Sequence, residues 1–295
     1  MSRITELQNG NNSIYKLFAQ KQIYSEVKRD YSIKVLMIMI AAIIFPIVIS
    51  KYPAARQPLG AISIIIFLSE ILIFERIEFA KRKVAAKIQE LFDTEVLGIN
   101  WNEFVAGSIP DLEIVGKYQK YITDEDKEHL RDWYPSSLSK LPLNSARLLC
   151  QRANIWWDSS LRKAFSNLLI GVCIILILIL LVLNRNDSLT NAALNIVPFL
   201  PLFRVLYVQI VAQRLSATLV DDLKNKLDEL INKLAKKTIQ DKDISEHDIR
   251  SIQDEIYRHR STNQPIPNWF YYLFRDSYES SMKFNADELV DKILS

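Results

Sequence analysis

The segment from Phe165 to Leu183 carries no charged side chain and constrains the fold of this chain more than any other feature. It consists mainly of Leu, Ile and Val (FSNLLIGVCIILILILLVL). At about 1.5 Å per residue, an α-helix of this length covers roughly 28 Å, close to the thickness of the hydrocarbon core of a bilayer. The segment is therefore predicted to cross a membrane as an α-helix.

Three further apolar segments have the length of a membrane span. They cover residues 33–50, with Pro46 inside, residues 58–74, and residues 189–212, which carry several polar side chains. The connections at 51–57 and 184–188 are so short that each can only join antiparallel neighbours. The sequence thus predicts an all-α integral membrane protein with four transmembrane helices in two hairpins, at residues 33–76 and 165–212.

The basic residues are distributed unevenly between the two sides of the predicted spans. The two short turns contain only Lys51, Arg56 and Arg185, whereas Lys and Arg are frequent on the opposite flanks. Positive charge next to a span favours the cytoplasmic side. We therefore expect a cytosolic N-terminal helix (1–32), a cytosolic helical segment (77–164) and cytosolic C-terminal amphipathic helices (213–295). Both termini would be cytoplasmic, and the spans would lie in a bacterial inner membrane.

Two stretches next to the spans have the apolar spacing of amphipathic helices. Residues 75–92 continue the second span as a basic helix without a helix breaker. After the fourth span, leucines recur every three or four residues, the spacing of a helix face or of a short coiled coil. This stripe would pack against the protein's own helices or against a second copy. Its members are Leu215, Leu219, Leu223, Leu227, Leu230 and Leu234.

The rest of the predicted cytosolic region is less regular. Thr123 and Ser245 each precede acidic residues in the pattern of a helix start with a capping box, so we interpret these acids as first-turn charges. Residues 111–119 (DLEIVGKYQ) are compatible with an extended backbone. The aromatic-rich stretch that follows Pro267 would lie on the inner membrane surface or dock onto the cytosolic helices.

Sequence signatures of hydrolases and of nucleotide-handling enzymes are absent. The chain has no Gly-x-Ser-x-Gly, no Walker-type Gly-Lys-[Ser/Thr] loop and no Gly-x-Gly-x-x-Gly. None of the three histidines, His129, His247 and His259, has a second ligand at the spacing of a metal site. We therefore expect no enzymatic activity, no cofactor and no metal site. A net charge of +3 is also too small to indicate a binder of DNA or RNA polymers.

Two charged side chains fall within the predicted spans. Glu70 lies roughly 8 Å inside the inner boundary of the second span, and Arg204 lies at a comparable depth in the fourth. Ionisable groups inside a membrane are costly and usually face a partner or water. We expect Glu70 and Arg204 to pair or to line one aqueous path. Alternatively, each extends its long side chain separately to the inner interface.

Pro198 and Pro201 interrupt the backbone hydrogen bonding of the fourth span. Such kinks occur beside cavities and also as simple packing features. Asn191, Asn195 and Gln209 on the same helix make this span the best candidate to face a polar interior. Because four helices leave little room for a pore, a pore would require several subunits, and we expect a homo-oligomer with this span turned inward.

Three segments of the chain carry a resemblance to a known family. They are Gln8-Asn9 with LFAQKQIYSEVK (17–28), CQRANIWWDSSLRK (150–163) directly before the third span, and IPNWFYYLFRDSYESSMKFNADELV (266–290) near the end. With the two hairpins they cover nearly the whole chain. The chain resembles the S-4TM family of pore-forming effectors, which are associated with SMODS-type nucleotidyltransferases in bacterial anti-phage systems.

The resemblance implies a membrane effector of cyclic-oligonucleotide-based anti-phage defence (CBASS). In such a system a partner nucleotidyltransferase makes a cyclic oligonucleotide during infection. The effector then permeabilises the inner membrane and causes growth arrest or cell death. The partners implied are the lipid bilayer, further copies of the chain and this second messenger. The resemblance supplies no established ligand-binding residues.

Arginines and aromatic residues gather in two of these segments, where an anionic nucleotide could bind. Guanidinium groups suit its phosphates, and aromatic faces suit its bases. Alternatively, Trp and Arg beside a span serve as interfacial anchors. The candidate ligand-binding residues are Arg147, Arg152, Trp156, Trp157, Arg162, Lys163, Arg258 and Arg260, with Trp269, Tyr271 and Arg275 in the tail.

A membrane-anchored interaction module is the alternative function. In that case the spans only tether the chain, and the cytosolic helices bind a protein partner without forming a pore. A secondary transporter fits less well, because the two hairpins show no clear internal repeat. Loss of membrane potential on activation separates an effector from a tether.

Overall fold

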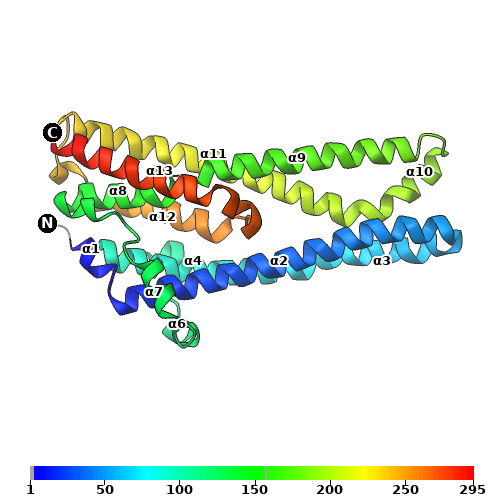
Figure 1. Cartoon of the computed structure of the whole chain (residues 1–295), viewed down its shortest axis with the longest axis horizontal. Coiled ribbons are helices and arrows are strands. Elements are labelled where there is room, and N and C mark those ends of the chain that lie inside the picture. Colours follow the sequence, from blue (N-terminus) through cyan, green and yellow to red (C-terminus); the bar gives the residue numbers. More distant parts are fainter. Residues whose placement is uncertain (1–2, 157) are drawn as a thin grey trace.

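The computed structural model of the chain describes residues 3–156 and 158–295, with residues 275–283 described by their backbone alone. Every element in the described part is helical, which confirms the predicted all-α class. The long helices lie along one axis of an elongated molecule, and both termini lie at the same end (Figure 1). At the opposite end lie the two turns of the predicted hairpins.

The first hairpin is built from two nearly continuous helical rods. Helix α2 (Asn11–Lys51) contains most of the predicted N-terminal helix (1–32) and the first span in one piece. After a short 3₁₀ turn, α3 (Arg56–Ser69) leads through a π-helical turn (Glu70–Phe74) into α4 (Glu75–Leu97). The predicted basic helix thus does continue the second span. It ends at Gly98, which adopts the left-handed conformation with φ of 63°.

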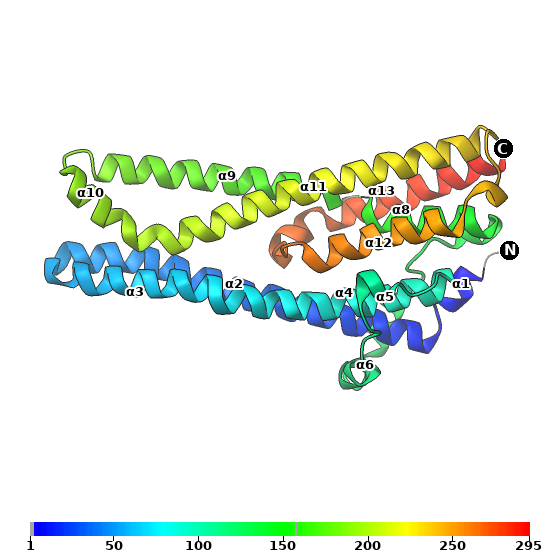
Figure 2. The same ribbon diagram turned by 180° about the vertical axis from the view of Figure 1, so that it is seen from behind.

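The second hairpin contains the third and fourth spans. Helix α9 (Asp158–Leu183) is followed by α10 (Leu189–Ile196), a 3₁₀ turn (Val197–Phe199) and α11 (Leu200–Ala235). The described residues contain four helices that are long and apolar enough to cross a membrane, as predicted. Helix α11 packs against α2 and α3, whereas α9 packs mainly on α11. Figure 2 shows α9 on the outer side of this arrangement.

The end of the molecule away from the two turns is a helical core. Helices α8 (Leu143–Ile155), α12 (Glu246–Thr262) and α13 (Asn268–Leu294) surround the ends of α2, α4 and α11 there. Leu223, Leu227 and Leu234 of the predicted stripe are buried in this core, so this part packs within the chain. Leu215 and Leu219, nearer the span, are exposed.

The C-terminal helix α13 docks through one face of its aromatic stretch. Phe270 is buried against Leu161 and Phe165 of α9. Trp269, by contrast, is 58% exposed. The aromatic stretch therefore both contacts the helices and presents rings to the surroundings.

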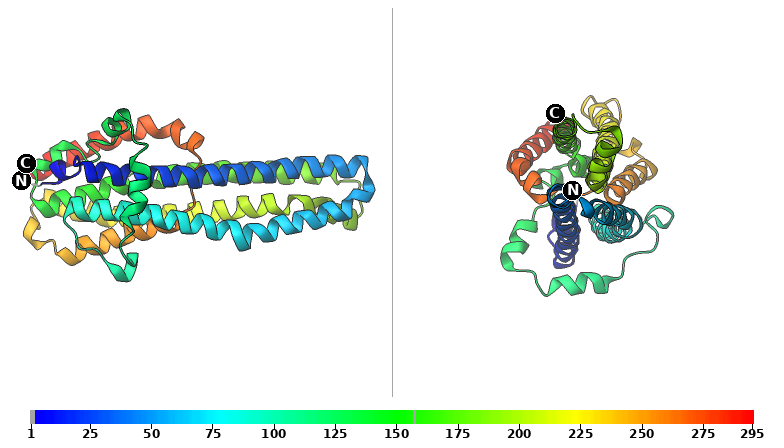
Figure 3. Two further views of the ribbon diagram at one scale, coloured as in Figure 1. Left: turned by 90° about the horizontal axis from the view of Figure 1, so that it is seen from below. Right: turned by 90° about the vertical axis from the view of Figure 1, so that its right-hand side faces the viewer.

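A chain of short helices forms an arm beside the core. It contains α5 (Glu103–Ala106), α6 (Leu112–Gln119), α7 (Asp124–Leu130) and a 3₁₀ turn (Ser136–Lys140), and a one-turn helix α1 (Ile4–Leu7) lies nearby. The end-on view in Figure 3 shows part of this arm standing off from the long helices. Residues 111–119 are helical, not extended as the sequence had suggested, because Asp111 caps α6 by accepting a hydrogen bond from the Glu113 amide. Thr123 forms the predicted capping box of α7, and Ser245 caps α12.

Candidate functional site

Three charged side chains meet where the first hairpin leaves its long apolar stretch. The ammonium of Lys34 on α2 lies between the carboxylates of Glu70, in the π turn, and Glu78, on α4. Its Nζ lies 3.0 Å from Glu70 Oε1 and 2.5 Å from Glu78 Oε1. Only 7–8% of the surface of each residue is exposed. Burial raises the pKa of Glu78 although Lys34 opposes this shift. Two carboxylates thus share one ammonium in surroundings of low polarity.

The π-helical turn places both carboxylates on the same helix face. In a regular α-helix eight residues cover about 2.2 turns, so side chains at positions 70 and 78 would diverge by roughly 80°. A π turn holds about one residue more, so two turns here correspond to about eight residues. Glu70 and Glu78 therefore lie two turns apart above one another and reach the same ammonium. Turns of this kind frequently occur at functional sites.

The structure corrects the predicted direct pair between Glu70 and Arg204. Arg204 on α11 donates instead to Glu75, with an Nη2–Oε2 distance of 2.8 Å, and so connects the two hairpins. Glu70 is engaged by Lys34, to which the sequence had assigned no role. Antiparallel helices bring together residues at similar distances from their turn, and Lys34 and Glu70 lie on either side of the turn at 51–57. That similar distance is the signal in the sequence that could have placed the two residues at about the same level of the hairpin, whereas the rotation of the helices decides that they meet.

The two prolines of the fourth span lie at the contact between the hairpins. Pro198 belongs to the 3₁₀ turn that separates α10 from α11, and Pro201 stands in the first turn of α11. Both are buried. The 3₁₀ turn packs on α2 and α3, and a methyl group placed on Gly60 of α3 would lie 3.7 Å from Val197. The kink therefore has a packing role, and whether it also borders a pore stays a prediction.

A series of buried polar side chains connects α11 to the helical core. Gln213 donates to Gln209 on the same helix with an Nε2–Oε1 distance of 2.9 Å. Arg162 of α9 donates to Gln213 Oε1 at 2.5 Å and to Asp158 Oδ2 at 2.5 Å. The same carboxylate oxygen lies 2.6 Å from Nε2 of His259 at the end of α12. We call Gln209, Gln213, Arg162, Asp158 and His259 the polar relay.

The polar relay also holds the linker between α12 and α13. Gln213 Nε2 and Arg162 Nη1 donate to the carbonyl of Gln264 at 3.2 and 3.3 Å. Arg82 of α4 donates to the carbonyls of Thr262 and Asn263. Three long side chains from α4, α9 and α11 thus converge on one short stretch of backbone. A displacement of this linker would therefore change the contacts of three long helices, α4, α9 and α11.

The titratable groups of the relay have shifted pKa values. Burial lowers the pKa of His259 and outweighs the opposing effect of Asp158, and Arg162 and Arg260 lower it further. Burial alone would raise the pKa of Asp158, but Arg162 and His259 hold it below its usual range. The lowered pKa favours the neutral imidazole near pH 7, with its Nε2 facing the carboxylate oxygen of Asp158. Burial and the nearby Arg162 also lower the pKa of Lys28 to about 8.

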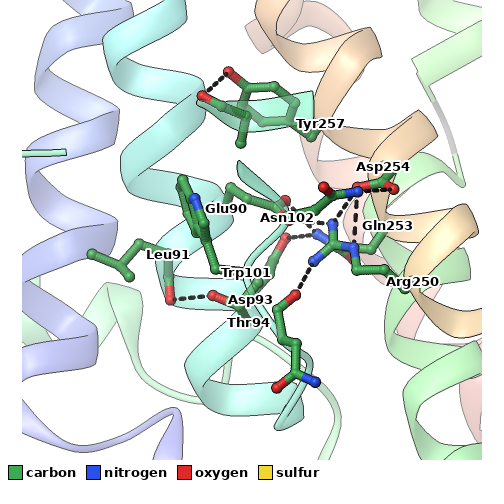
Figure 4. Close-up of polar contacts among 12 residues, drawn as sticks. Glu90, Leu91, Asp93, Thr94, Trp101, Asn102, Arg250, Gln253, Asp254 and Tyr257 are labelled. Atoms are coloured by element: carbon green, nitrogen blue, oxygen red, sulfur yellow. Dashed lines mark hydrogen bonds and ion pairs between the residues drawn. The ribbon is translucent and has the colours of Figure 1, made fainter. Parts of the chain in front are cut away.

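A second buried network joins α4 to α12 (Figure 4). Arg250 Nη2 lies 2.6 Å from Glu90 Oε1, and Gln253 Nε2 donates to Glu90 Oε2 at 2.8 Å and to Asp93 Oδ2 at 3.0 Å. Arg260 pairs with the same Asp93. Burial raises the pKa of Glu90 despite the charge of Arg250. These contacts fix the orientation of α12 on α4 and so set the position of the linker that follows α12.

The cationic groups predicted to bind a ligand make contacts within the chain. Arg147 donates to the carbonyls of Leu97 and Gly98 at 2.6 and 2.5 Å and pairs with Glu246. The other cations also face acidic residues. These contacts are Arg152 with Asp228, Arg162 with Asp158, Lys163 with Asp221, Arg258 with Glu255, and Arg260 with Asp93.

These residues do not form one group, because they lie on α8, α9 and α12. Among them, Arg162 and Arg260 are both close enough to His259 for their charges to lower its pKa. An anionic ligand would have to replace carboxylates that already engage these cations. Their role in binding a ligand stays a prediction.

The predicted aromatic residues lie in different surroundings. Two cations lie near the ring of Trp156, with Arg152 Cζ 4.4 Å and Lys224 Nζ 4.6 Å from its centre. The ring of Tyr271 lies 5.1 Å from Lys28 Nζ. Trp157 lies outside the described residues, as does the side chain of Arg275.

In the described part of the chain, His, Cys, Asp and Glu form no group of three or more that could hold a metal ion.

Comparison with known proteins finds relatives over nearly the whole chain. The family model of the SMODS-associating 4TM effector domain matches residues 2–289. A probable CBASS effector molecule of Bacillus cereus strain VD146 is 29% identical over an alignment of 293 positions, and the match covers 94% of this chain and 95% of the relative. No solved structure matches the chain.

Proposed function

We propose a function for this chain on the premise that it belongs to the SMODS-associating 4TM effector family: it is the membrane effector of a CBASS anti-phage system and permeabilises the bacterial inner membrane when activated. Depolarisation would then stop growth or kill the infected cell. Membership of the family and the four membrane helices support the effector role and the multi-pass membrane location. Permeabilisation, the inner membrane and the cytoplasmic position of both termini belong to the proposal.

The observation that carries the proposal is the polar relay between the helical core and the spans. Helices α2, α4 and α11 each continue from the core toward the spans, so a movement in the core is transmitted along stiff helices. The relay connects α9, α11 and α12 through buried hydrogen bonds, which resist independent sliding of these helices. A signal received in the core can thereby shift α11, which carries the contact between the hairpins.

The proposed activating signal is the cyclic oligonucleotide of the partner nucleotidyltransferase. Such a ligand is anionic and would compete with the carboxylates for the cations of α8, α9 and α12. Binding would therefore exchange intramolecular ion pairs for contacts to phosphate. Arg147→Ala and Arg152→Ala test this part of the proposal: loss of activation at unchanged membrane level supports it, and a normal response in both variants removes it.

The experiment that tests the function is a measurement of membrane potential. Cells that produce the full chain are followed with a voltage-sensitive dye, together with an active or an inactive form of the neighbouring nucleotidyltransferase. We expect rapid depolarisation in the cells with the active enzyme and none in the cells with the inactive enzyme. An unchanged potential, with production of the chain and of the second messenger verified, would contradict the proposal.

A tethered interaction module is the second candidate, and the arm around α5 and α6 favours it. Phe104 is fully exposed, and Ile109, Leu112 and Tyr121 on the same arm are also largely exposed. Exposed apolar side chains outside the spans are typical of contact surfaces for a protein. Under this alternative, Phe104→Ser and Leu112→Ser abolish binding of the protein partner. Activation of the wild-type chain then causes no depolarisation.

A further inference from the structure

The cluster of Lys34, Glu70 and Glu78 has the composition of a cation site that is occupied by a side chain of the protein. Two carboxylates point at one ammonium, so one negative charge of the cluster stays uncompensated when all three groups are ionised. The Tyr31 ring lies 4.9 Å from Lys34 Nζ and adds a cation–π contact. Two carboxylate oxygens and an aromatic ring thus take the place of part of a cation's hydration shell.

We propose that Glu70 and Glu78 select cations at the inner mouth of the permeation path, and that Lys34 blocks this mouth in the resting protein as a tethered cation. The inference rests on the proposed permeabilising function and assigns it an ion selectivity and a resting-state lock. Acidic side chains at the constriction of a pore favour cations and repel anions, because little water is present to screen them.

The space that the structure leaves beside the resting cluster is small. The cavity beside it measures about 10 Å³, roughly what a single water molecule requires. Its walls come from both hairpins: Lys34, Glu70 and Glu78 from the first, and Val205 and Gln209 from α11. Glu70 lines this cavity and is 92% buried. Its Oε2 atom has no hydrogen-bond partner among the described residues. A second acceptor for a cation is therefore already in place.

The wall from α11 connects the lock to the cytosolic core. Gln209 lines the cavity and accepts a hydrogen bond from Gln213, the next member of the polar relay. The cluster belongs entirely to the first hairpin. A shift of α11 therefore leaves the contacts among Lys34, Glu70 and Glu78 in place and moves Val205 and Gln209 away from them. Water can then enter and hydrate the Lys34 ammonium, which lowers the cost of its leaving the carboxylates. Glu70 and Glu78 remain behind and face the opened path.

The test is a measurement of ion selectivity and of resting leak on the full chain. In cells with the active nucleotidyltransferase, membrane patches from spheroplasts are recorded in a tenfold gradient of KCl. We expect the reversal potential to lie near the K⁺ equilibrium potential. In the Glu70→Gln, Glu78→Gln double variant it should move toward zero. In Glu103→Gln, an exposed carboxylate on the arm, it should stay unchanged.

The lock is tested without activation. Lys34→Gln should raise the resting K⁺ leak at least tenfold in cells with the inactive enzyme, whereas Lys34→Arg, which keeps the charge, should not. Lys51→Gln, at the exposed far end of the same helix, is the matched control. If Lys34→Gln is absent from the membrane, the reciprocal exchange Lys34→Glu, Glu70→Lys keeps one cation in the cluster and should restore a tight resting state.

The outcomes separate this inference from the proposed function. If the wild-type chain fails to depolarise cells with the active enzyme, the proposed function itself is contradicted. If it depolarises them but passes Cl⁻ as well as K⁺, or the double variant keeps its preference for K⁺, the selectivity is contradicted. A resting leak that stays at the wild-type level in Lys34→Gln would contradict the lock.

Discussion

At the scale of single residues, buried carboxylates determine how the helical core is held together. Asp93 on α4 is fully buried and accepts hydrogen bonds from Tyr134 at 2.7 Å and from Gln253 at 3.0 Å, besides its ion pair with Arg260. Removing one partner from such a cluster leaves the other charge without compensation in a place that water does not reach. The carboxylate therefore matters more for stability than an exposed ion pair would.

Asp93→Asn should destabilise the protein by about 3–5 kcal/mol, because the buried Arg260 guanidinium loses its counter-charge. The measurement is thermal unfolding of the detergent-solubilised chain, together with its level in membranes. Asp124→Asn is the control, since Asp124 pairs with Lys127 on the exposed surface of α7 and should have no measurable effect. Equal melting temperatures for Asp93→Asn and the wild type would contradict the structural role of Asp93.

The shifted pKa of His259 makes the stability of the core dependent on pH. The folded protein keeps this imidazole neutral, because its pKa is lowered by burial, whereas the unfolded chain binds a proton below a pKa of about 6.5. The unfolded state then holds more protons, so stability falls as the pH falls below this value. Asp158, whose pKa is also lowered, adds a loss in the same direction at more acidic pH.

We therefore expect the melting temperature to drop between pH 7.5 and 5.5, and the drop to be smaller in His259→Gln. The exposed His129 supplies the control, because His129→Gln should leave the wild-type drop unchanged. An identical drop in wild type and His259→Gln would show that this histidine does not carry the effect.

At the scale of elements, the polar relay joins helices that lie far apart in the sequence. Gln213 is its central member, since it contacts Gln209, Arg162 and the carbonyl of Gln264. Each of these contacts reaches a different part of the molecule: α11 itself, α9 and the linker before α13. A change at this one position should uncouple the linker from the spans without exposing a large apolar surface.

Gln213→Leu should abolish or strongly reduce depolarisation by the active partner enzyme while the chain remains in the membrane. The leucine has a similar volume but cannot accept the hydrogen bond from Arg162. Membrane level and melting temperature are measured alongside the dye signal. Gln119→Leu on the exposed end of α6 provides the matched substitution and should respond like the wild type. Normal depolarisation in Gln213→Leu would exclude the relay as the route of the signal.

At the scale of the whole molecule, the third span has little protein around it. Helix α9 contacts mainly α11, and residues on more than one of its sides, including Val172, Ile174 and Ile177, are exposed. Lipid covers such a surface in a monomer, and a second copy covers part of it in an oligomer. The proposed pore requires several copies, so this helix offers a place to detect them.

The chain's own cysteines provide the test of assembly. Cys173 lies partly exposed on α9, whereas Cys150 is buried in the core. Oxidation of membranes with copper phenanthroline, which joins neighbouring thiols within the bilayer as a disulfide, should give dimers after activation, because neighbouring copies bring Cys173 close to its equivalent. Cys173→Ser should remove these dimers, and Cys150→Ser should leave them unchanged. Activation with full depolarisation but no Cys173-dependent dimers would place the contact between copies elsewhere.

Properties that depend on short stretches of residues could be predicted from the sequence. The four spans, the two hairpins, the continuous helix after the second span and the helix starts at Thr123 and Ser245 follow from local hydropathy, breakers and capping residues. The structure agrees with each of them. Membrane crossing in particular leaves the chain few alternatives, because a long apolar segment must satisfy its backbone hydrogen bonds within itself.

The partners of the charged residues were decided by the tertiary structure alone. Each residue in an α-helix turns its side chain by about 100° relative to its neighbour, so one additional residue in the π turn changes which face Glu70 occupies. For this reason Glu70 contacts Lys34, and Arg204 contacts Glu75. The same holds for Arg147, whose guanidinium is engaged by backbone carbonyls near Gly98. The composition of a segment tells which charges are present, whereas rotation and packing of the helices determine which of them meet.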